Sequence, residues 1–465
     1  MENVMESNSH VADDDPARQG GFDKVGSIAT NVAEGFTMVA VGDLIVSRSL
    51  TKGHHPGFSD IVAILHEADV TFGNMETNIF DIRSFKGSPQ AEYGGAYLAS
   101  PPEIGPDLKA MGFNIVSRAN NHTLDWGLEG MRETSRLLDE NGIVHAGAGE
   151  NLAQAGAARF LETARGRVAL VSFAARYTPM SRACDPAGEA PGRPGLNALR
   201  LAVSIVVSPE MLESLKQLRN AVPAPDPSRQ DPKRVEFTPD PYHGGVTYET
   251  GDKVGYSYEP NPRDVTDILR NIRRGKQFSD FCIAASHCHQ PGNWSQEPAN
   301  YEQSFAYQLI DSGADAYVGH GPHQLRGIEI YKGRPIFYSL GNFFLDDLRS
   351  PVGADMFEVY GKDPRVDTDA EVTIASNGDS VDTLFFESVV TVSRFEQNQL
   401  AELRLYPIEL GFSKRFANRG VPRLASAAQG RTILERLQKL SKPFGTEITI
   451  DNGVGVIRLQ PISPQ

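Results

Sequence analysis

Short apolar runs alternate with stretches of helical periodicity over most of the chain. Runs that end in glycine or polar residues predict buried strands, and apolar residues spaced three and four apart predict helices. In the first part of the chain the pattern predicts strands at 36–42, 70–72, 113–117, 143–145 and 168–173, and helices at 58–68, 101–111 and 126–141. Because strands that alternate with helices favour a parallel sheet covered on both faces, the pattern predicts an α/β fold.

The same alternation returns after residue 262 and then changes. It predicts helices at 264–276, 301–312 and 425–440, and strands at 281–285, 316–318, 327–331, 335–340, 447–450 and 454–459. The long runs at 384–395 and 400–410 alternate between apolar and polar positions instead. Such alternation is typical of antiparallel strands with one solvated face.

The middle of the chain, residues 176–262, has a different composition. It holds 13 of the 30 prolines and one stretch of helical periodicity, 209–220. One interpretation is a surface insertion with little regular structure, and the other is a wall or lid over a site. Composition does not separate the two, although insertions of this length are more often functional.

Composition narrows the class of protein and its partners. Apolar residues make up 40% of the 465 residues and charged residues 22%, as in soluble globular proteins. The 59 acidic and 45 basic side chains give a formal net charge of −14. This charge argues against nucleic acid as a partner, because a protein needs a basic face to bind the phosphate backbone. The basic stretch 270–276 is a candidate local patch for an anionic substrate. Three cysteines do not make a disulfide framework, and the odd number fits a reducing compartment.

Residues 1–35 carry seven acidic and two basic side chains. This excess predicts a poorly ordered acidic tail and differs from the basic start of a secretory signal. The most apolar run, Leu201–Val207, is far shorter than the roughly 20 residues of a membrane-spanning helix. We therefore expect a cytoplasmic protein that has no membrane partner and acts on a small-molecule or peptide-like substrate.

Polar side chains follow five of the predicted strands, at the point where each strand ends. They are Asp43, Asn74 with Glu76, Asn120, Asn121 and His122 with Asp125, His287 with His289, and His320 with His323. Because the carboxyl ends of parallel strands line the ligand site of an open α/β sheet, we expect these side chains to meet at one edge. Each alone has a simpler explanation, such as a helix N-cap for Asp43 or a turn for residues 120–121.

The combination of residue types indicates a metal site. Carboxylate, amide oxygen and imidazole ligands suit a borderline divalent ion such as zinc, manganese or iron. The sequence contains no paired cysteines of a structural zinc cluster, no phosphate-binding Walker loop, no Gly-x-Ser-x-Gly elbow and no His-Glu-x-x-His motif. We therefore expect one or two divalent ions at this edge.

The order of these motifs resembles a known family. The motifs are Gly-Asp at 42–43, Gly-Asn-x-Glu at 73–76, Asn-Asn-His-x-x-Asp at 120–125, a strand-end histidine at 287, Gly-His-Gly-Pro-His at 319–323 and Tyr-Ser-Leu-Gly-Asn-Phe at 338–343. Together they resemble the poly-γ-glutamate capsule synthesis proteins, the CapA family, which is similar in turn to the calcineurin-like metallophosphoesterases. The resemblance implies a four-layered metallophosphoesterase-like α/β sandwich over residues 36–411. The insertion at 176–262 interrupts this domain, and a helix and strand extension at 412–465 follows it.

The resemblance also implies roles for individual residues. The implied metal ligands are Asp43, Glu76, Asn121, His287, His320 and His323. His122 would act on the leaving group, and Asp125 would orient its imidazole. The family commonly has Trp-Gly after the fourth-motif histidine, whereas Cys288 and His289 follow here, so we assign His289 to substrate binding, with a further metal ligand as the alternative. Ile45 stands where the wider superfamily has a histidine, which leaves the ion count at one or two.

Two kinds of function fit this pattern. A bound metal lowers the pKa of its water to about 7 and thereby supplies hydroxide at neutral pH. The first hypothesis is therefore a soluble metal-dependent hydrolase acting on a γ-glutamyl or peptide-type amide bond, with a phosphoester as the alternative bond. The second is a non-catalytic component of poly-γ-glutamate capsule synthesis or export. We favour the hydrolase because a membrane segment or lipid anchor, which would support the second, is not visible in the sequence.

Overall fold

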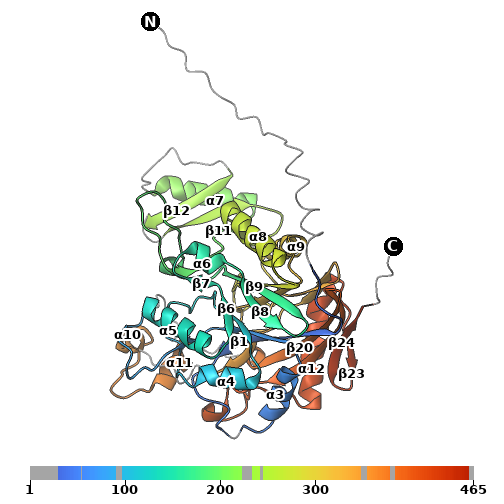
Figure 1. Cartoon of the computed structure of the whole chain (residues 1–465). Coiled ribbons are helices and arrows are strands. Elements are labelled where there is room, and N and C mark those ends of the chain that lie inside the picture. The colour runs from blue at the N-terminus through green and yellow to red at the C-terminus, as the bar shows by residue number, and fades with distance from the viewer. Residues whose placement is uncertain are drawn as a thin grey trace.

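The computed structural model (Figure 1) describes residues 30–53, 55–90, 97–222, 233–240, 244–346, 353–377 and 383–459. Most of the predicted acidic tail, residues 1–29, and part of the proline-rich stretch, residues 223–232, lie outside the described residues. The described part of the chain forms two large sheets, a smaller sheet within the insertion, and the helices that cover them. Among the described helices, none combines the length and the apolar composition needed to cross a bilayer.

The larger sheet has ten strands and joins a parallel part to an antiparallel part. The parallel part consists of β6 (Val144–Ala146), β5 (Ile115–Ser117), β2 (Val70–Met75), β1 (Phe36–Ile45) and β19 (Asn342–Leu345). The antiparallel part consists of β20 (Glu387–Glu396), β21 (Gln399–Glu409), β22 (Arg423–Leu424), β24 (Val454–Arg458) and β23 (Thr449–Asp451). The antiparallel pair predicted at 384–410 is confirmed, and the C-terminal extension completes this sheet.

The smaller of the two large sheets has six strands in the order β17-β18-β16-β15-β9-β8. Its strands are β17 (Ile328–Tyr331), β18 (Arg334–Phe337), β16 (Ala316–His320), β15 (Phe281–His287), β9 (Gly166–Ala174) and β8 (Arg159–Thr163). The central strands run parallel, and their register places Ala174, His287 and His320 side by side. Three strand ends therefore meet at one edge of this sheet.

The two sheets face each other across a shared apolar core, and helices cover their outer faces. Within this core the rings of Phe36 and Phe281, one from each sheet, lie 5.0 Å apart between centroids. The covering helices are α3 (Phe58–His66), α4 (Ile104–Met111) and α5 (Gly127–Glu140) on the larger sheet, and α8 (Pro262–Gln277) and α9 (Glu302–Asp311) on the smaller one. Helix α12 (Ala427–Ser441) contributes Ile433, Leu434 and Leu437 to the core between the sheets. The predicted four-layered α/β sandwich is confirmed.

The folded part of the chain begins before Phe36. Val32 is buried in the core between the sheets, and its backbone N–H donates to Oδ1 of Asn398 at 2.9 Å. Thr30 hydrogen-bonds Asp280 at the start of β15. The tail therefore ends before residue 35, and the predicted boundary is wrong. Nothing in the sequence pattern indicates this, because a single buried valine in a polar stretch makes no periodic pattern.

The insertion forms a unit of its own, at the top of the molecule in Figure 1. It contains β11 (Leu201–Val207), helix α7 (Pro209–Ala221), β12 (Arg234–Asp240), β13 (Gly244–Thr250) and β14 (Gly255–Pro260). The strands pair in the order β12-β13-β11-β14, and Val207, Leu212 and Val235 form a small core beneath α7. The helix was predicted, and of the two interpretations the one of a surface insertion with little regular structure is wrong. The short β12 to β14 have few apolar residues, so their composition resembles that of loops.

The remaining elements are short. They are β3 (Asn78–Ile79), β4 (Ala99–Ser100), β7 (Ala148–Gly149), α6 (Leu152–Gly156), β10 (Gly195–Leu196), α10 (Ala354–Val359) and α11 (Asp369–Asn377). The pair β3–β4 lies next to the strand-end loops that carry the candidate site, because β3 follows β2 directly.

The basic stretch 270–276 does not form a patch beside the strand ends. It lies in the last turns of α8, which leads into the start of β15 and so lies at the opposite end of that strand from His287. Lys276 is buried, and its Nζ lies 2.9 Å from Oδ2 of Asp315. Arg270 pairs with Asp267 at 2.8 Å on the same helix. The expectation of a receptive patch here is therefore wrong.

Candidate metal centre

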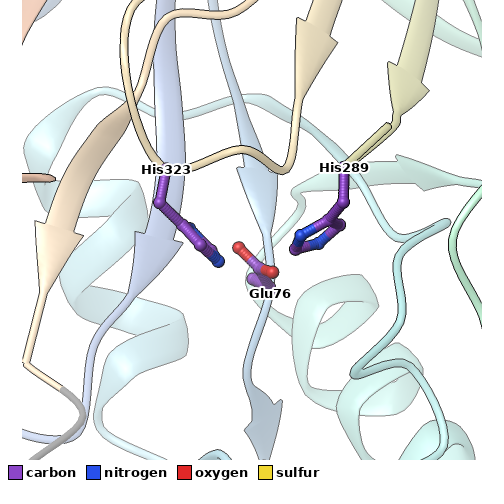
Figure 2. A group of neighbouring side chains, drawn as sticks. All are labelled: Glu76, His289 and His323. Atoms are coloured by element: carbon purple, nitrogen blue, oxygen red, sulfur yellow. The ribbon is translucent and has the colours of Figure 1, made fainter. Parts of the chain in front are cut away.

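Two overlapping groups of carboxylates and imidazoles lie where the strands of both large sheets end. One donor atom each of Asp43, Glu76 and His287 lies within 4.8 Å of the others, and the same holds for Glu76, His289 and His323. Figure 2 shows His289 and His323 on either side of Glu76, with all three side chains pointing toward one another. Five of the strand-end residues predicted from the sequence therefore converge.

Glu76 belongs to both groups and lies directly after β2. Its side chain is fully buried, and its Oε1 lies 3.5 Å from Nε2 of His287 and 3.9 Å from Nε2 of His122. A carboxylate buried this deeply costs free energy unless positive charge or a metal ion lies beside it. The position of Glu76 among imidazoles is thus suited to a bound cation.

Asp43 lies near the end of β1 and is also fully buried. Its Oδ1 accepts a hydrogen bond from Nδ2 of Asn74 at 2.8 Å, and its Oδ2 lies 3.4 Å from Nδ1 of His323. Burial raises the pKa of this carboxyl, but the hydrogen bond and charge of His323, with the charges of His320 and His287, hold it well below its usual range. Asp43 therefore offers an ionised carboxylate at neutral pH.

Glycine at position 42 makes this geometry possible. A Cβ at Gly42 would collide with the backbone carbonyl of Gly341, and the N–H of Asp43 donates to that carbonyl at 2.9 Å. Gly341 itself has φ 69°, a conformation that other residues rarely adopt. The close approach of these two backbones fixes β1 against β19 where Asp43 enters the site.

His287 ends β15, and His289 follows it in the loop. Their Nε2 atoms lie 2.9 Å apart. Nδ1 of His287 lies 3.2 Å from Nδ2 of Asn74, and Nδ1 of His289 lies 2.7 Å from Oδ1 of Asn293. Burial holds the pKa of both imidazoles well below its usual range, and the neighbouring histidines add to this effect. Both rings are therefore neutral near pH 7, which is the form that binds metals.

His122 and Asp125 form a hydrogen-bonded pair beside these groups. Nδ1 of His122 lies 2.7 Å from Oδ2 of Asp125, which also accepts from the backbone N–H of Leu98 at 3.0 Å. Burial raises the pKa of Asp125, while His122 and the Leu98 N–H oppose that rise. Trp126 follows the pair and is buried against Phe80, with ring centroids 4.9 Å apart. The imidazole is held by Asp125 with its Nε2 toward Glu76.

One expected ligand, His320, lies outside both groups, and a second, Asn121, is an amide, which groups of carboxylates and imidazoles do not include. His320 is buried, its Nε2 lies 3.3 Å from the carbonyl oxygen of Val41, and its ring lies against Phe72 with centroids 5.6 Å apart. Asn121 has a buried Oδ1 that makes no hydrogen bond with any described residue. His320 thus faces the backbone of β1, whereas Asn121 retains an unused oxygen beside His122. The roles expected of both stay predictions.

Four asparagines that were given no role support the candidate ligands, three by direct contact and Asn120 through Asn74. Asn74 contacts both Asp43 and His287, as described above, and Oδ1 of Asn74 accepts from Nδ2 of Asn120 at 3.2 Å. Oδ1 of Asn342 lies 3.0 Å from Nδ1 of His323, whose φ is 58°. Asn293 supports His289. All except Asn293 stand inside the sequence motifs, but their contacts cross between strands and are invisible in spacing alone.

The residues present fit a divalent metal ion. The groups combine two buried carboxylates with imidazoles, of which His287 and His289 are neutral, and the adjacent loop adds an amide oxygen without a hydrogen-bond partner among the described residues. This is the mixture of ligands that zinc, manganese and iron accept. Asparagine side chains that hold the ligands are typical second neighbours of a metal.

Comparison with known proteins finds one family and several relatives. Residues 37–347 match the family described as bacterial capsule synthesis protein PGA_cap. The uncharacterized protein y4sH of Sinorhizobium fredii is 68% identical over 465 residues, which cover 98% of this chain and 99% of the relative. The capsule biosynthesis protein CapA of Bacillus anthracis is 25% identical over 318 residues, 67% of this chain and 60% of the relative. A probable polyglutamine synthesis accessory protein of Mycobacterium tuberculosis is 26% identical over 303 residues, 64% of this chain and 62% of the relative.

Proposed function

Since the chain belongs to the family of bacterial capsule synthesis proteins PGA_cap, we propose that it is a metal-dependent hydrolase. The observation that carries the proposal is the convergence of Asp43, Glu76, His287, His289 and His323 at the strand ends of two sheets. Packing alone gives no reason to bury two carboxylates among histidines at this edge. A cluster of ionisable groups that shift one another's pKa is a common feature of active sites.

Each group in the centre has a chemical role in the proposal. Asp43, Glu76, His287, His289 and His323 would hold the ion, and Asn121 would add an oxygen ligand. When bound, the ion supplies hydroxide by lowering the pKa of its water to about 7. His122 would donate a proton from Nε2 to the leaving group, and Asp125 would keep the imidazole in the orientation that directs Nε2 toward the reacting bond.

The proposed substrate bond is an amide of γ-glutamyl type, with a phosphoester as the alternative. The names of two relatives, capsule biosynthesis protein and polyglutamine synthesis accessory protein, support an amide polymer. Ile45 supports it as well, because this buried apolar side chain stands where metallophosphoesterases carry a ligand histidine. The word accessory also keeps a non-catalytic role in polymer synthesis as the second candidate.

The insertion is proposed as a wall that shapes the substrate site. The hydroxyl of Tyr258 donates to the carbonyl oxygen of Pro291 at 3.4 Å, in the loop that carries His289. Trp294 in the same loop is 72% exposed, and its ring centroid lies 6.5 Å from that of the half-exposed Tyr256. Replacing Tyr256 or Trp294 by alanine should change the relative kcat/KM for competing substrates while metal content stays constant. Loss of metal in either variant would instead assign the contact a structural role.

The test of the proposed function combines metal analysis with turnover. Purified wild type and a Glu76→Ala, His323→Ala double variant are analysed for zinc, manganese and iron, then assayed with a γ-glutamyl anilide and a nitrophenyl phosphodiester. One or two equivalents of metal in the wild type, lost in the variant together with turnover, are the expected result. Stoichiometric metal without turnover of either substrate would favour the non-catalytic candidate. Absence of metal after soaking with each ion would refute the proposal.

A further inference from the structure

Arg176 lies two residues beyond the end of β9, at the edge where β15 delivers His287. The backbone N–H of Ala175 donates to the carbonyl oxygen of His287 at 2.9 Å. The side chain of Gln290 donates to the carbonyl oxygen of Ala175 at 3.2 Å. These two bonds fasten the segment that carries Arg176 to the loop that carries His289.

The guanidinium of Arg176 carries a charge that no described carboxylate neutralises. The side chain is exposed, and no carboxylate among the described residues lies within 4.0 Å of its nitrogens. Arg200, farther along the same connection, differs because its Nη2 lies 2.7 Å from Oδ1 of Asp264. In the register of the sheet His287 lies beside Ala174, and Ala175 hydrogen-bonds the carbonyl oxygen of His287, so the backbone of Arg176 lies at the strand end that delivers this candidate ligand.

A cation at the edge that carries a candidate metal centre needs a physical reason. Like charges repel, so Arg176 weakens the binding of a metal ion unless an anion lies between them. A guanidinium presents a planar fork of N–H donors that matches the oxygens of a carboxylate or a phosphate. An anionic group of a ligand that lies between them would be attracted to both the metal and Arg176. These two attractions would offset the repulsion between the cations.

We propose that Arg176 binds an anionic group of the substrate, a carboxylate or a phosphate, and selects for substrates that carry one next to the reacting bond. This substrate class belongs to the hydrolase proposed above, and calling the ligand a substrate rests on that proposal. Binding of the anionic group itself does not depend on turnover. The side chain is a specificity determinant, since it contacts the substrate away from the reacting atoms.

The test measures ligand binding to the metal-loaded full chain by calorimetry. The probes are tri-γ-glutamate, the same tripeptide with its free carboxylates converted to amides, and inorganic phosphate. The variants are Arg176→Gln and Arg176→Lys. The matched control is Arg274→Gln, which removes an exposed arginine of α8 near the opposite end of the sheet. Metal affinity is measured alongside, because a structural defect and a lost anion contact move it differently.

The expected result is selective. Arg176→Gln should weaken binding of tri-γ-glutamate, or of phosphate if that is the natural group, by about 10-fold or more, the size of a charge-assisted hydrogen bond. Metal affinity should stay equal or rise, Arg176→Lys should retain part of the binding, and the control should match the wild type. Anion binding that depends on Arg176, in a protein that turns over neither assay substrate, would favour the non-catalytic candidate and keep this inference. Equal affinity of wild type and Arg176→Gln for both anions, or no binding of either anion by the wild type, would overturn it.

Discussion

The two large sheets contribute chemically different halves of the candidate centre. The ten-stranded sheet supplies the carboxylates Asp43 and Glu76 and the pair His122–Asp125. The six-stranded sheet and the loops that follow it supply His287, His289 and His323. One half therefore contributes carboxylates, and the other contributes imidazoles, of which His287 and His289 have a pKa that burial holds well below its usual range.

This division shows what holds the centre together. Each half alone would be costly to bury, since carboxylates need positive charge and imidazoles need hydrogen-bond partners. Facing each other, they satisfy part of that need, and Asn74 joins them by contacting Asp43 from one sheet and His287 from the other. The buried carboxylates still need positive charge beside them. A metal ion bound there would hold the two sheets together in addition to any role in catalysis.

The largest effect should come from the anionic half. Glu76→Gln keeps the shape of the side chain but removes the charge shared by both groups, so metal affinity should fall by at least about 100-fold and turnover should vanish. Metal analysis and chelator competition measure the change, with Glu150→Gln, an exposed glutamate paired with Arg132, as the control. Full metal content in Glu76→Gln would show that the imidazole half is sufficient.

His122 separates chemistry from metal binding within the same half. His122→Ala should lower kcat by about 10²- to 10⁴-fold, the usual contribution of a general acid, while metal content is unchanged. Steady-state kinetics measure this with whichever of the two assay substrates the wild type turns over. The control is His66→Ala, which replaces an exposed histidine of α3. If turnover survives in His122→Ala, the role assigned to this residue is wrong.

The link between the halves should have a smaller effect. Asn74→Ala removes the hydrogen bonds to Asp43 and His287, so metal affinity should fall by about 10- to 100-fold, as expected for a residue that orients ligands. A metal titration of this variant is compared with Asn452→Ala in the exposed turn between β23 and β24. Unchanged affinity would mean that each half is held in place by its own sheet.

A histidine away from the centre isolates the effect of burial. His145 in β6 is buried beside the cation Arg118. Burial, and to a lesser extent the charge of Arg118, lower the pKa of His145 to about 4, although the charge of Asp139 raises it. Because the folded pKa is below the unfolded value near 6.5, the unfolded chain takes up this proton first, and stability falls as the pH drops from 6.5 toward 4. Urea unfolding at pH 7.5 and pH 5 should show that His145→Gln loses about 2 kcal/mol less than the wild type.

The control for that experiment is His66→Gln, which removes an exposed histidine of α3. It should keep the wild-type difference between the two pH values. Equal losses in the wild type and His145→Gln would mean that His145 is protonated in the folded state near pH 5.

The sequence predicted the layers and most of the centre because both follow from local pattern. Strands β1, β2, β5, β15 and β16 are buried and end in the polar motifs, so apolar runs and strand-end residues were enough to find them. The grouping of His289 with Glu76 and His323, and the position of His320 against Val41, depend on how two sheets dock. Such docking distances are not encoded in spacing along the chain.

The elements that were missed share a different cause. Strands β12, β13 and β14 have too few apolar residues to stand out from loops, and their small core forms only when α7 covers them. Val32 is packed by residues from distant strands, so its burial has no local pattern. Asn293 follows no strand directly, and nothing in its surroundings along the chain identifies it as the support of His289.

The chain has two tryptophans, and each lies beside one half of the centre. Trp126 follows Asp125 in the loop of the ten-stranded sheet and is buried, whereas Trp294 follows Asn293 in the loop of the six-stranded sheet and is 72% exposed. A buried indole emits at shorter wavelength than a hydrated one, so the intrinsic fluorescence of the protein contains two separable colours. Binding that alters the first loop would shift the blue component, and binding that alters the second would shift the red. The molecule therefore carries its own optical reporter for each sheet.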